Sequence, residues 1–260
     1  MNTIKHIDNS YSIHLDSRDS INSRYLFSNP IIVPIGYQAV MSLISCEIPL
    51  TFYNINKNNN KLHITENAIA RDIIISYGNY NITQLRSELQ NQFGPNYNIT
   101  YNSISNKLSI QLLANITTII DINNSTIGNV IGYIINHTII LNQTITSDTV
   151  CNMTYTLSLY YTVDIVDEET LLSQTGKTNN IIQKIPINSP QNTILIFYPT
   201  QAKHIVFCAN NIRTITINLF DDRMREIDLN GQYFISTLLV QFIQYDNVNI
   251  EDIESDLLRY

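Results

Sequence analysis

The chain has 260 residues, enough for one large all-β domain or two small ones, and a formal net charge of −7. That charge argues against a role in coating nucleic acid, because neutralising phosphates requires clustered Lys and Arg. Only 14% of the residues are charged, and the three cysteines are too few for a disulfide framework.

Strand signals recur about every ten residues, which is the spacing of sandwiches and barrels. Ile, Thr and Tyr are frequent in these segments and fit a pleated, half-buried surface. In chain order we expect strands over residues 37–48, 62–65, 72–77, 99–101, 107–112, 154–161, 193–197, 204–208, 214–219 and 234–242. Residues 102–106 lie between two of these segments and predict a hairpin.

Helical signals are sparse. Asn81, with Gln84 three positions later, has the spacing of a capping box, and Gly94-Pro95 ends the run. Leu85, Leu89 and Phe93 then fall on one face of the expected helix. A short second helix is expected from Ser125 to Ile131, before Gly132.

No catalytic or metal-binding constellation stands out. The five histidines are scattered, and none has a neighbour at metal-ligand spacing (His6, His14, His63, His137, His204). There is no Gly-rich phosphate loop, G-x-S-x-G elbow or H-E-x-x-H motif. Cys46 and Cys208 lie in apolar runs and are interpreted as buried thiols of a reducing compartment rather than nucleophiles. We expect no enzyme activity, no catalytic residue, no metal and no cofactor.

Acidic residues cluster at two places inside the chain. One cluster could hold Ca²⁺ but is better interpreted as a solvated loop (Asp164, Asp167, Glu168, Glu169). The other is Asp221-Asp222. The acidic end of the chain, residues 251–256, is interpreted as an exposed terminus or a contact strip for a basic neighbour. Tyr160 and Tyr161 could line a sugar site, although ordinary sheet packing is the simpler interpretation.

An ordered series of short motifs resembles a known family. Leu15-Asp16-Ser17-Arg18-Asp19 is similar to the opening of the minor capsid proteins of large DNA viruses, polinton-like elements and virophages. Further segments resemble the other motifs of that family: residues 47–55 (EIPLTFYNI), 78–81 (GNYN) with the following helix, 130–133 (VIGY), and 219–223 (LFDDR) with 229–232 (LNGQ). The series spans roughly residues 15 to 242.

This resemblance implies a single jelly-roll β-sandwich of two antiparallel sheets and about eight strands, with one short helix inserted. It implies an extended N-terminal arm over residues 1–20 and one jelly-roll domain over residues 21–260. Copies of the chain would form a homopentamer, the penton, at the vertices of an icosahedral virion, beside a double-jelly-roll major capsid protein. The chain would be made in the host cytoplasm, and the arm is a candidate for contact with an internal membrane or a cement protein.

Two segments, residues 136–150 and 164–192, match no motif of this family. A jelly roll hosts many functions, so the fold alone does not determine the vertex position. The main alternative is a capsid cement or a host-attachment jelly roll that binds glycans. A hydrolase with an unrecognised site is the third hypothesis.

Overall fold

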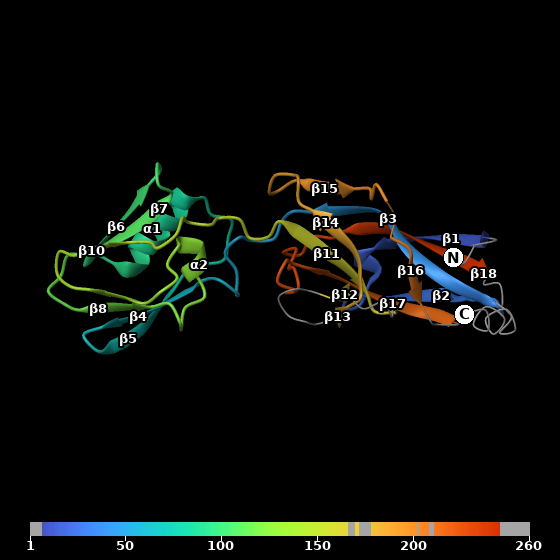
Figure 1. The fold of residues 1–260 in the computed structure, drawn as a ribbon, viewed down its shortest axis with the longest axis horizontal. Coiled ribbons are helices and arrows are strands. Elements are labelled where there is room, and N and C mark those ends of the chain that lie inside the picture. Colours follow the sequence, from blue (N-terminus) through green and yellow to red (C-terminus); the bar gives the residue numbers. More distant parts are fainter. Residues whose placement is uncertain (1–6, 166–169, 172–177, 202, 208–210, 245–260) are drawn as a thin grey trace, which may run out of the picture. The chain divides into compact units, whose positions relative to one another are not determined.

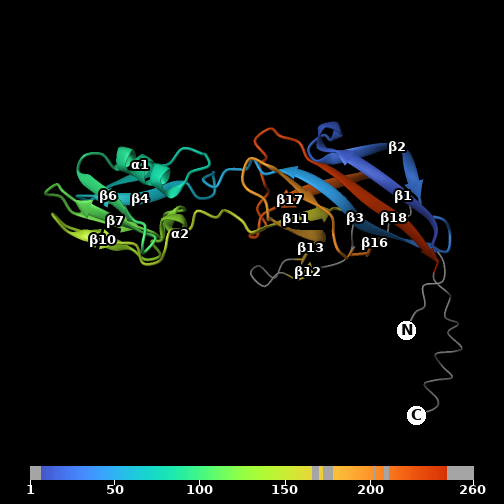
Figure 2. The same ribbon diagram turned by 90° about the horizontal axis from the view of Figure 1, so that it is seen from above.

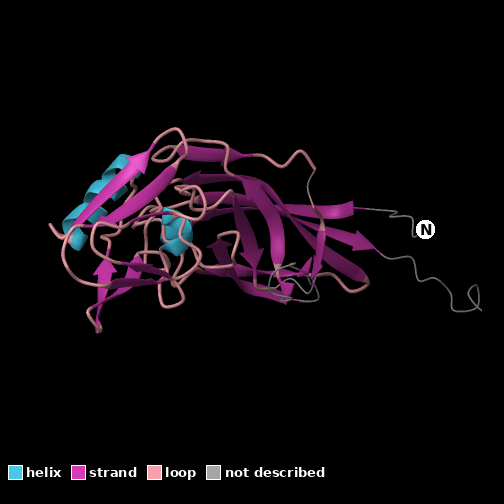
Figure 3. Cartoon of the chain, turned by 60° about the vertical axis from the view of Figure 1, so that its left-hand side comes forward, coloured by secondary structure: helices cyan, strands magenta, loops and turns pink. Residues whose placement is uncertain are grey.

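The computed structural model describes residues 7–165, 170–171, 178–201, 203–207 and 211–244 (Figure 1). Strands predominate and the described residues hold two α-helices, so the all-β prediction is confirmed (Figure 3). The chain divides into two compact units: unit 1, formed by residues 1–51 and 156–260, and unit 2, formed by residues 52–155. The range 21–260, expected to be one domain, therefore contains parts of both units.

The first sheet of unit 1 is antiparallel and joins the two ends of the chain. Its order is β1-β18-β3-β15, and β16 also pairs with β3. Figure 2 shows β1, β18 and β3 side by side. The bounds are β1 Ile7–Asp16, β18 Ile235–Gln244, β3 Tyr37–Pro49, β15 Ile194–Phe197 and β16 Ile205–Phe207.

The second sheet of unit 1 is also antiparallel, in the order β14-β11-β17-β2. The bounds are β14 Ile181–Pro186, β11 Ser158–Val163, β17 Asn211–Phe220 and β2 Arg24–Ile32. Two short strands, β12 (Thr170–Leu171) and β13 (Thr178–Asn179), pair with each other, and a 3₁₀ turn, η1, covers Ser17–Asp19.

Together the two sheets have the topology of a jelly roll. Along the chain β1, β2, β3 and β11 alternate between the sheets; β14 stays beside β11, and β15, β17 and β18 alternate again. β15 and β16 share one position beside β3, so each sheet has four positions. The predicted jelly-roll sandwich is therefore confirmed for unit 1.

The core of unit 1 follows from alternation along its strands. Leu238 and Val240 on β18 face inward, as do Ile215 and Ile217 on β17, and all four are buried. One buried polar pair joins the two sheets, because the Tyr161 hydroxyl on β11 lies 2.7 Å from Ser236 Oγ on β18. Burial raises the pKa of Tyr161 well above its ordinary value.

The predicted N-terminal arm is wrong for most of its length. β1 pairs with β18 from Asp16↔Ile235 to Ile7↔Ile243, and Ile13 and Leu15 are buried in the core. The polar residues between them, Ser12 and His14, face outward, so the segment has the period of a half-buried strand. Residues 1–6 lie outside the described range.

Unit 2 holds two small antiparallel sheets and both helices. One sheet has the order β5-β4-β8-β9 and the other β10-β7-β6. The bounds are β4 Lys61–Glu66, β5 Ile69–Ile74, β6 Tyr97–Asn102, β7 Lys107–Leu112, β8 Thr118–Asp121, β9 His137–Ile139, β10 Thr144–Thr146, α1 Ile82–Phe93 and α2 Gly128–Ile131. These elements share a core of their own, from Ile55 to Ile145.

Helix α1 has the predicted boundaries for the predicted reasons. The Asn81 side chain accepts from Gln84 N, the Gln84 side chain accepts from Asn81 N, and Gly94 ends the helix at φ 82°. The apolar face is buried, and Gln90 hydrogen-bonds the backbone of β6 at Tyr97 O and Ile99 N. Since β6 is an edge strand, these bonds satisfy groups that have no strand partner on that side.

The predicted inserted helix, α1, is part of a larger insertion, because unit 2 as a whole interrupts the jelly roll. It enters the jelly roll between β3 and β11, and within unit 2 the rings of Phe52 and Tyr155, at its two ends, lie 5.9 Å apart. Adjacent ends allow such an insertion without disturbing the host strands.

A carboxylate links three strands of unit 2. Glu66 accepts from Arg71 Nε at 2.8 Å and from the Tyr97 hydroxyl at 2.6 Å, and that hydroxyl also lies 2.6 Å from Thr118 Oγ1. The bond from Arg71 lowers the pKa of Glu66, while burial and the bond to Glu66 raise the pKa of Tyr97.

We predict that Glu66→Gln destabilises unit 2 by about 1 kcal/mol at neutral pH, a value reduced by the partial exposure of the pair. A carboxyl group whose pKa is lower in the folded than in the unfolded protein stabilises the fold at pH values above its unfolded-state pKa. This contribution is lost as the pH falls through the folded-state pKa. Urea unfolding followed by tyrosine fluorescence should show a smaller difference near pH 3. Glu88→Gln is the control, at a half-buried carboxylate of α1 that accepts from Gln92 Nε2. An equal loss at both pH values would contradict the prediction.

Candidate functional site: the motif corner of unit 1

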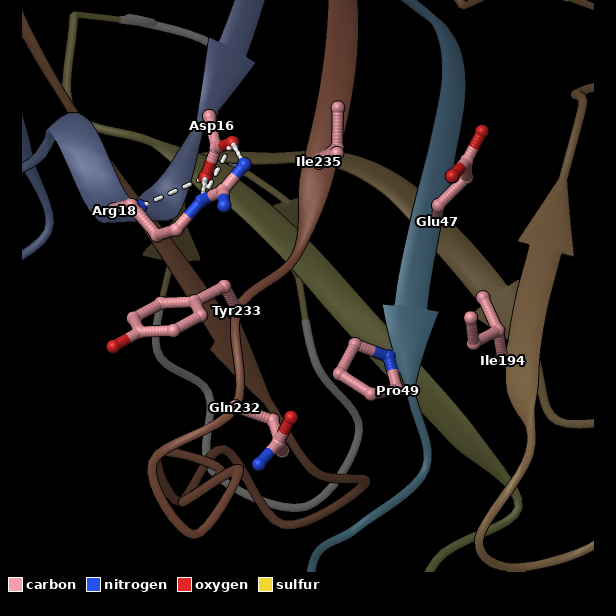
Figure 4. A pocket seen from close by; sticks show the side chains of 8 residues that line it. All are labelled: Asp16, Arg18, Glu47, Pro49, Ile194, Gln232, Tyr233 and Ile235. Carbon is pink, nitrogen blue, oxygen red and sulfur yellow. Dashed lines mark hydrogen bonds and ion pairs between the residues drawn. The ribbon is translucent and has the colours of Figure 1, made fainter.

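Three of the family-like motif segments meet at one end of the jelly roll. We call residues 15–19, 47–51 and 229–235 the motif corner (Figure 4). They come from the end of β1, the end of β3 and the approach to β18, which are adjacent strands of one sheet.

The Leu15–Asp19 segment forms a tight turn that is bonded to the segment before β18. Asp16 accepts from Arg18 N and Arg18 Nε at 3.0 Å and also pairs with Arg18 NH2. Ser17 N donates to Phe234 O, and Phe234 N donates to Ser17 Oγ. The Arg18 bonds lower the pKa of Asp16, and Arg18 lies over the Tyr233 ring at 5.9 Å.

The Asn230-Gly231 pair forms a tight turn. Asn230 has φ 52° and Gly231 φ 77°, and Gln232 N donates to Leu229 O. However, the turn lies inside a longer loop, because β17 and β18 belong to opposite sheets and form no hairpin. Thr51 Oγ1 donates to Leu229 O, and Asn230 Nδ2 donates to Thr51 O, both at 2.6 Å.

An open pocket of about 320 Å³ lies at the motif corner, on the outward face of the sheet. Eight residues line it: Asp16, Arg18, Glu47, Pro49, Ile194, Gln232, Tyr233 and Ile235. Asp16 is engaged by Arg18, whereas Glu47 is exposed and has no hydrogen-bond or ion-pair partner within the described residues. An apolar floor beside a free carboxylate suits a partner's side chain that is apolar or basic.

Asp221 anchors the loop after β17. Its carboxylate is fully buried and accepts from Arg223 N, Arg225 N and Arg225 Nε at 2.7–2.9 Å. The neighbouring Asp222 is exposed. The two carboxylates of Asp221 and Asp222 therefore do not form one site. The partner of Asp221 is Arg225, which the sequence analysis missed and which its spacing of four residues from Asp221 could have indicated.

We predict that Asp221→Asn destabilises unit 1 by about 2–3 kcal/mol, because it leaves Arg225 without its buried charge partner. Asp222→Asn is the matched control and should change the free energy of unfolding by no more than about 0.5 kcal/mol. Denaturant unfolding measures both, and equal effects would contradict the account of this loop.

The remaining motif segments build unit 2. The Asn54 side chain accepts from Tyr80 N and donates to Tyr80 O, and Asn54 N donates to Asn79 Oδ1. Ile55 and Gly78 form an antiparallel bridge. Gly132 ends α2 at φ 81°, and a Cβ there would lie 2.3 Å from Thr149 O. Helix α2 is shorter than predicted, since it begins at Gly128.

We predict that Gly132→Ala destabilises unit 2 by more than about 3 kcal/mol, since it adds a backbone clash to the strain of a positive φ. Gly231→Ala has a similar φ of 77°, in the turn before β18, and nothing within 4 Å of the added Cβ. This control should lose only about 1–2 kcal/mol. Thermal unfolding of the two variants measures both losses of stability. Equal losses would contradict the proposed backbone clash at Gly132.

The structure leaves the histidines scattered. His14 lies 3.1 Å from Thr237 Oγ1, His63 pairs with Asp72, and His137 pairs with Asp148. Within the described ranges no group of three or more His, Cys, Asp or Glu could hold a metal ion. His6 lies outside those ranges.

The cysteines of the described part are shielded from reaction. Cys46 is buried, as predicted, and burial raises the pKa of its thiol to about 12. Cys151 is half-buried, and burial raises its pKa as well. Cys208 lies outside the described residues, so the prediction of a buried thiol there stays a prediction.

Of the first acidic cluster only Asp164 is described. Its carboxylate accepts from Thr216 N at 2.8 Å. Asp167, Glu168, Glu169 and the acidic end at residues 251–256 lie outside the described ranges.

The two strand tyrosines differ in exposure. Tyr161 is buried and cannot line a sugar site; Tyr160 is half-buried, with Lys184 Nζ 5.9 Å from its ring.

The two segments without a motif contain ordinary elements. Residues 136–150 hold β9 and β10, and the Asp148 carboxylate accepts from Ile134 N at 2.8 Å and lies 3.1 Å from His137 Nε2. Residues 164–192 hold β12, β13 and β14. β14 completes the second sheet of the jelly roll, so that part of the segment is framework.

Comparison with known proteins gives a likeness of structure without a match of sequence. No family model and no curated protein matches the chain. Among solved structures, the chain is similar to the crystal structure of the selenomethionine-labelled mavirus penton protein, at 11% sequence identity and a TM-score of 0.47, over 90% of this chain and 100% of that chain. At this identity and TM-score the likeness assigns neither a residue nor a role. Within the described residues no helix is long and apolar enough to cross a bilayer.

Proposed function

We propose that this chain is a structural virion protein: a jelly-roll minor capsid protein that forms the pentameric vertex of an icosahedral capsid. The observation that carries the proposal is the motif corner. The segments that resemble the minor capsid family, although far apart in the sequence, are hydrogen-bonded to each other at one end of the jelly roll.

The hydrogen bonds that these residues make favour a structural subunit over an enzyme. Asp16, Ser17, Thr51 and Asn230 direct their polar atoms to the backbone or to each other, and Asp221 holds its own loop. A catalytic motif would instead leave its polar groups facing a substrate space. The absence of enzymatic activity and of a cofactor is part of the proposal.

The proposed partners are further copies of the chain and a double-jelly-roll major capsid protein. The low charge content of the sequence and its exposed isoleucines and tyrosines suit a subunit whose surface is covered on assembly. Contact with a membrane or cement protein, proposed for the N-terminal arm, is confined to residues 1–6, because β1 belongs to the sheet.

We predict that the purified chain forms a species of five times its monomer mass. Light scattering after size exclusion, at the highest soluble concentration and again after dilution, measures this mass. A monomer at every concentration, or a dimer, would contradict the pentameric proposal. A monomer that also binds a glycan array would favour the host-attachment alternative.

A further inference from the structure

Two exposed apolar faces lie on the outer sides of the two sheets of the jelly roll, one on each sheet. One, the β15 face, consists of Ile194, Ile196, Tyr198, Tyr233 and Ile235. The other, the β2 face, has Leu26 at its centre, with the exposed Ile32 at the end of β2 and Ile35 in the loop that follows. We infer that the β15 face of one copy binds the β2 face of the next copy, an inference that rests on the proposed self-assembly.

The side chains of the β15 face point outward from the first sheet. Ile196 lies directly opposite Glu47, Glu47 opposite Ile235, and Ile235 opposite Asp16. Directly opposite residues point to the same side of a sheet, so Glu47 stands between two isoleucines. The five apolar side chains of the face are 42–66% exposed, and the pocket of Figure 4 lies among them.

The β2 face is more exposed and carries the opposite charge. Leu26, Ile32 and Ile35 are each at least 65% exposed. Arg24, two residues before Leu26, points to the same side of β2 and bonds only Thr214 Oγ1, at 3.3 Å, among the described residues. Arg24 therefore has no carboxylate partner in the described part of its own chain, just as Glu47 has no cation.

The two faces belong to different sheets of the sandwich. The β15 face lies on the sheet of β1, β18, β3 and β15, whereas β2 belongs to the sheet of β14, β11 and β17. A contact between two different faces is head-to-tail and closes into a ring when the rotation allows it. A two-fold contact of the β15 face with itself would instead bring Glu47 toward the Glu47 of the second copy, which like-charge repulsion disfavours.

The size of the β15 face supports a second copy as the occupant. Five large apolar residues on one face offer an area on the order of several hundred Å², above that of scattered surface residues. A standard interface covers about 800 Å² per partner, so this face and its polar rim are of the right order. The pocket can receive an apolar side chain such as Leu26 while Arg24 approaches Glu47.

Single substitutions test each face. Ile196→Asp and Leu26→Asp should each convert the oligomer to monomer, because each buries a carboxylate in an apolar contact. Ile104→Asp is the control: Ile104 is 94% exposed on a turn of unit 2 and should leave the mass unchanged. Circular dichroism checks that every variant is folded, and all three positions are exposed to solvent.

A charge exchange tests the pairing itself. Glu47→Arg or Arg24→Glu alone should weaken assembly at least tenfold, and the double variant should recover most of the loss. If the wild-type chain assembles and none of these variants changes its mass, the assigned faces are wrong and the proposed function stands. If the wild-type chain stays monomeric at every concentration, the proposed function and this inference both fail.

Discussion

The pairing of β18 between β1 and β3 is the constraint on which the rest of the structure depends. It places residues near the start of the chain beside residues near its end, from Asp16↔Ile235 to Ile7↔Ile243. The start of β1 and the end of β18 therefore lie at the same end of one sheet, and the motif corner lies at the opposite end of these strands. Few of these contacts are local, so the entropy of closing a long loop must be overcome before the sheet forms.

The same pairing explains how the chain accommodates a second unit. A connection between β3 and β11 can lengthen without breaking any strand pair, since its strands lie in different sheets. Unit 2 buries its own apolar residues and joins its sheets through Glu66, Arg71 and Tyr97. The jelly roll keeps its topology because the insertion supplies its own core.

Signals that act over a few residues were predictable from the sequence. The capping box at Asn81, the turn before Asn106 and the strand over Lys107–Leu112 each depend on near neighbours, and the structure confirms them. β1 was missed because its outward side is polar, and the boundary of unit 2 because no polar linker marks it. Leu50 is buried in unit 1 and Phe52 in unit 2, only two residues later.

The candidate site was predictable only as a set of motifs. Nothing local in the sequence indicates that Ser17, Thr51 and Asn230 belong to one corner, because strand order decides it. The β15 face does have a local signal in the sequence. Residues 193–197 (TILIF) are apolar on both sides of the strand, a pattern typical of a strand that is covered on both faces.

The central claim is that this jelly roll is a self-assembling building block in which the β15 face of one copy meets the β2 face of the next. Electron cryomicroscopy of the purified oligomer tests it most directly. The account predicts a closed ring with five-fold symmetry in which β15 of each copy faces β2 of the next. A two-fold dimer, or a ring in which both of these strands face solvent, would contradict it.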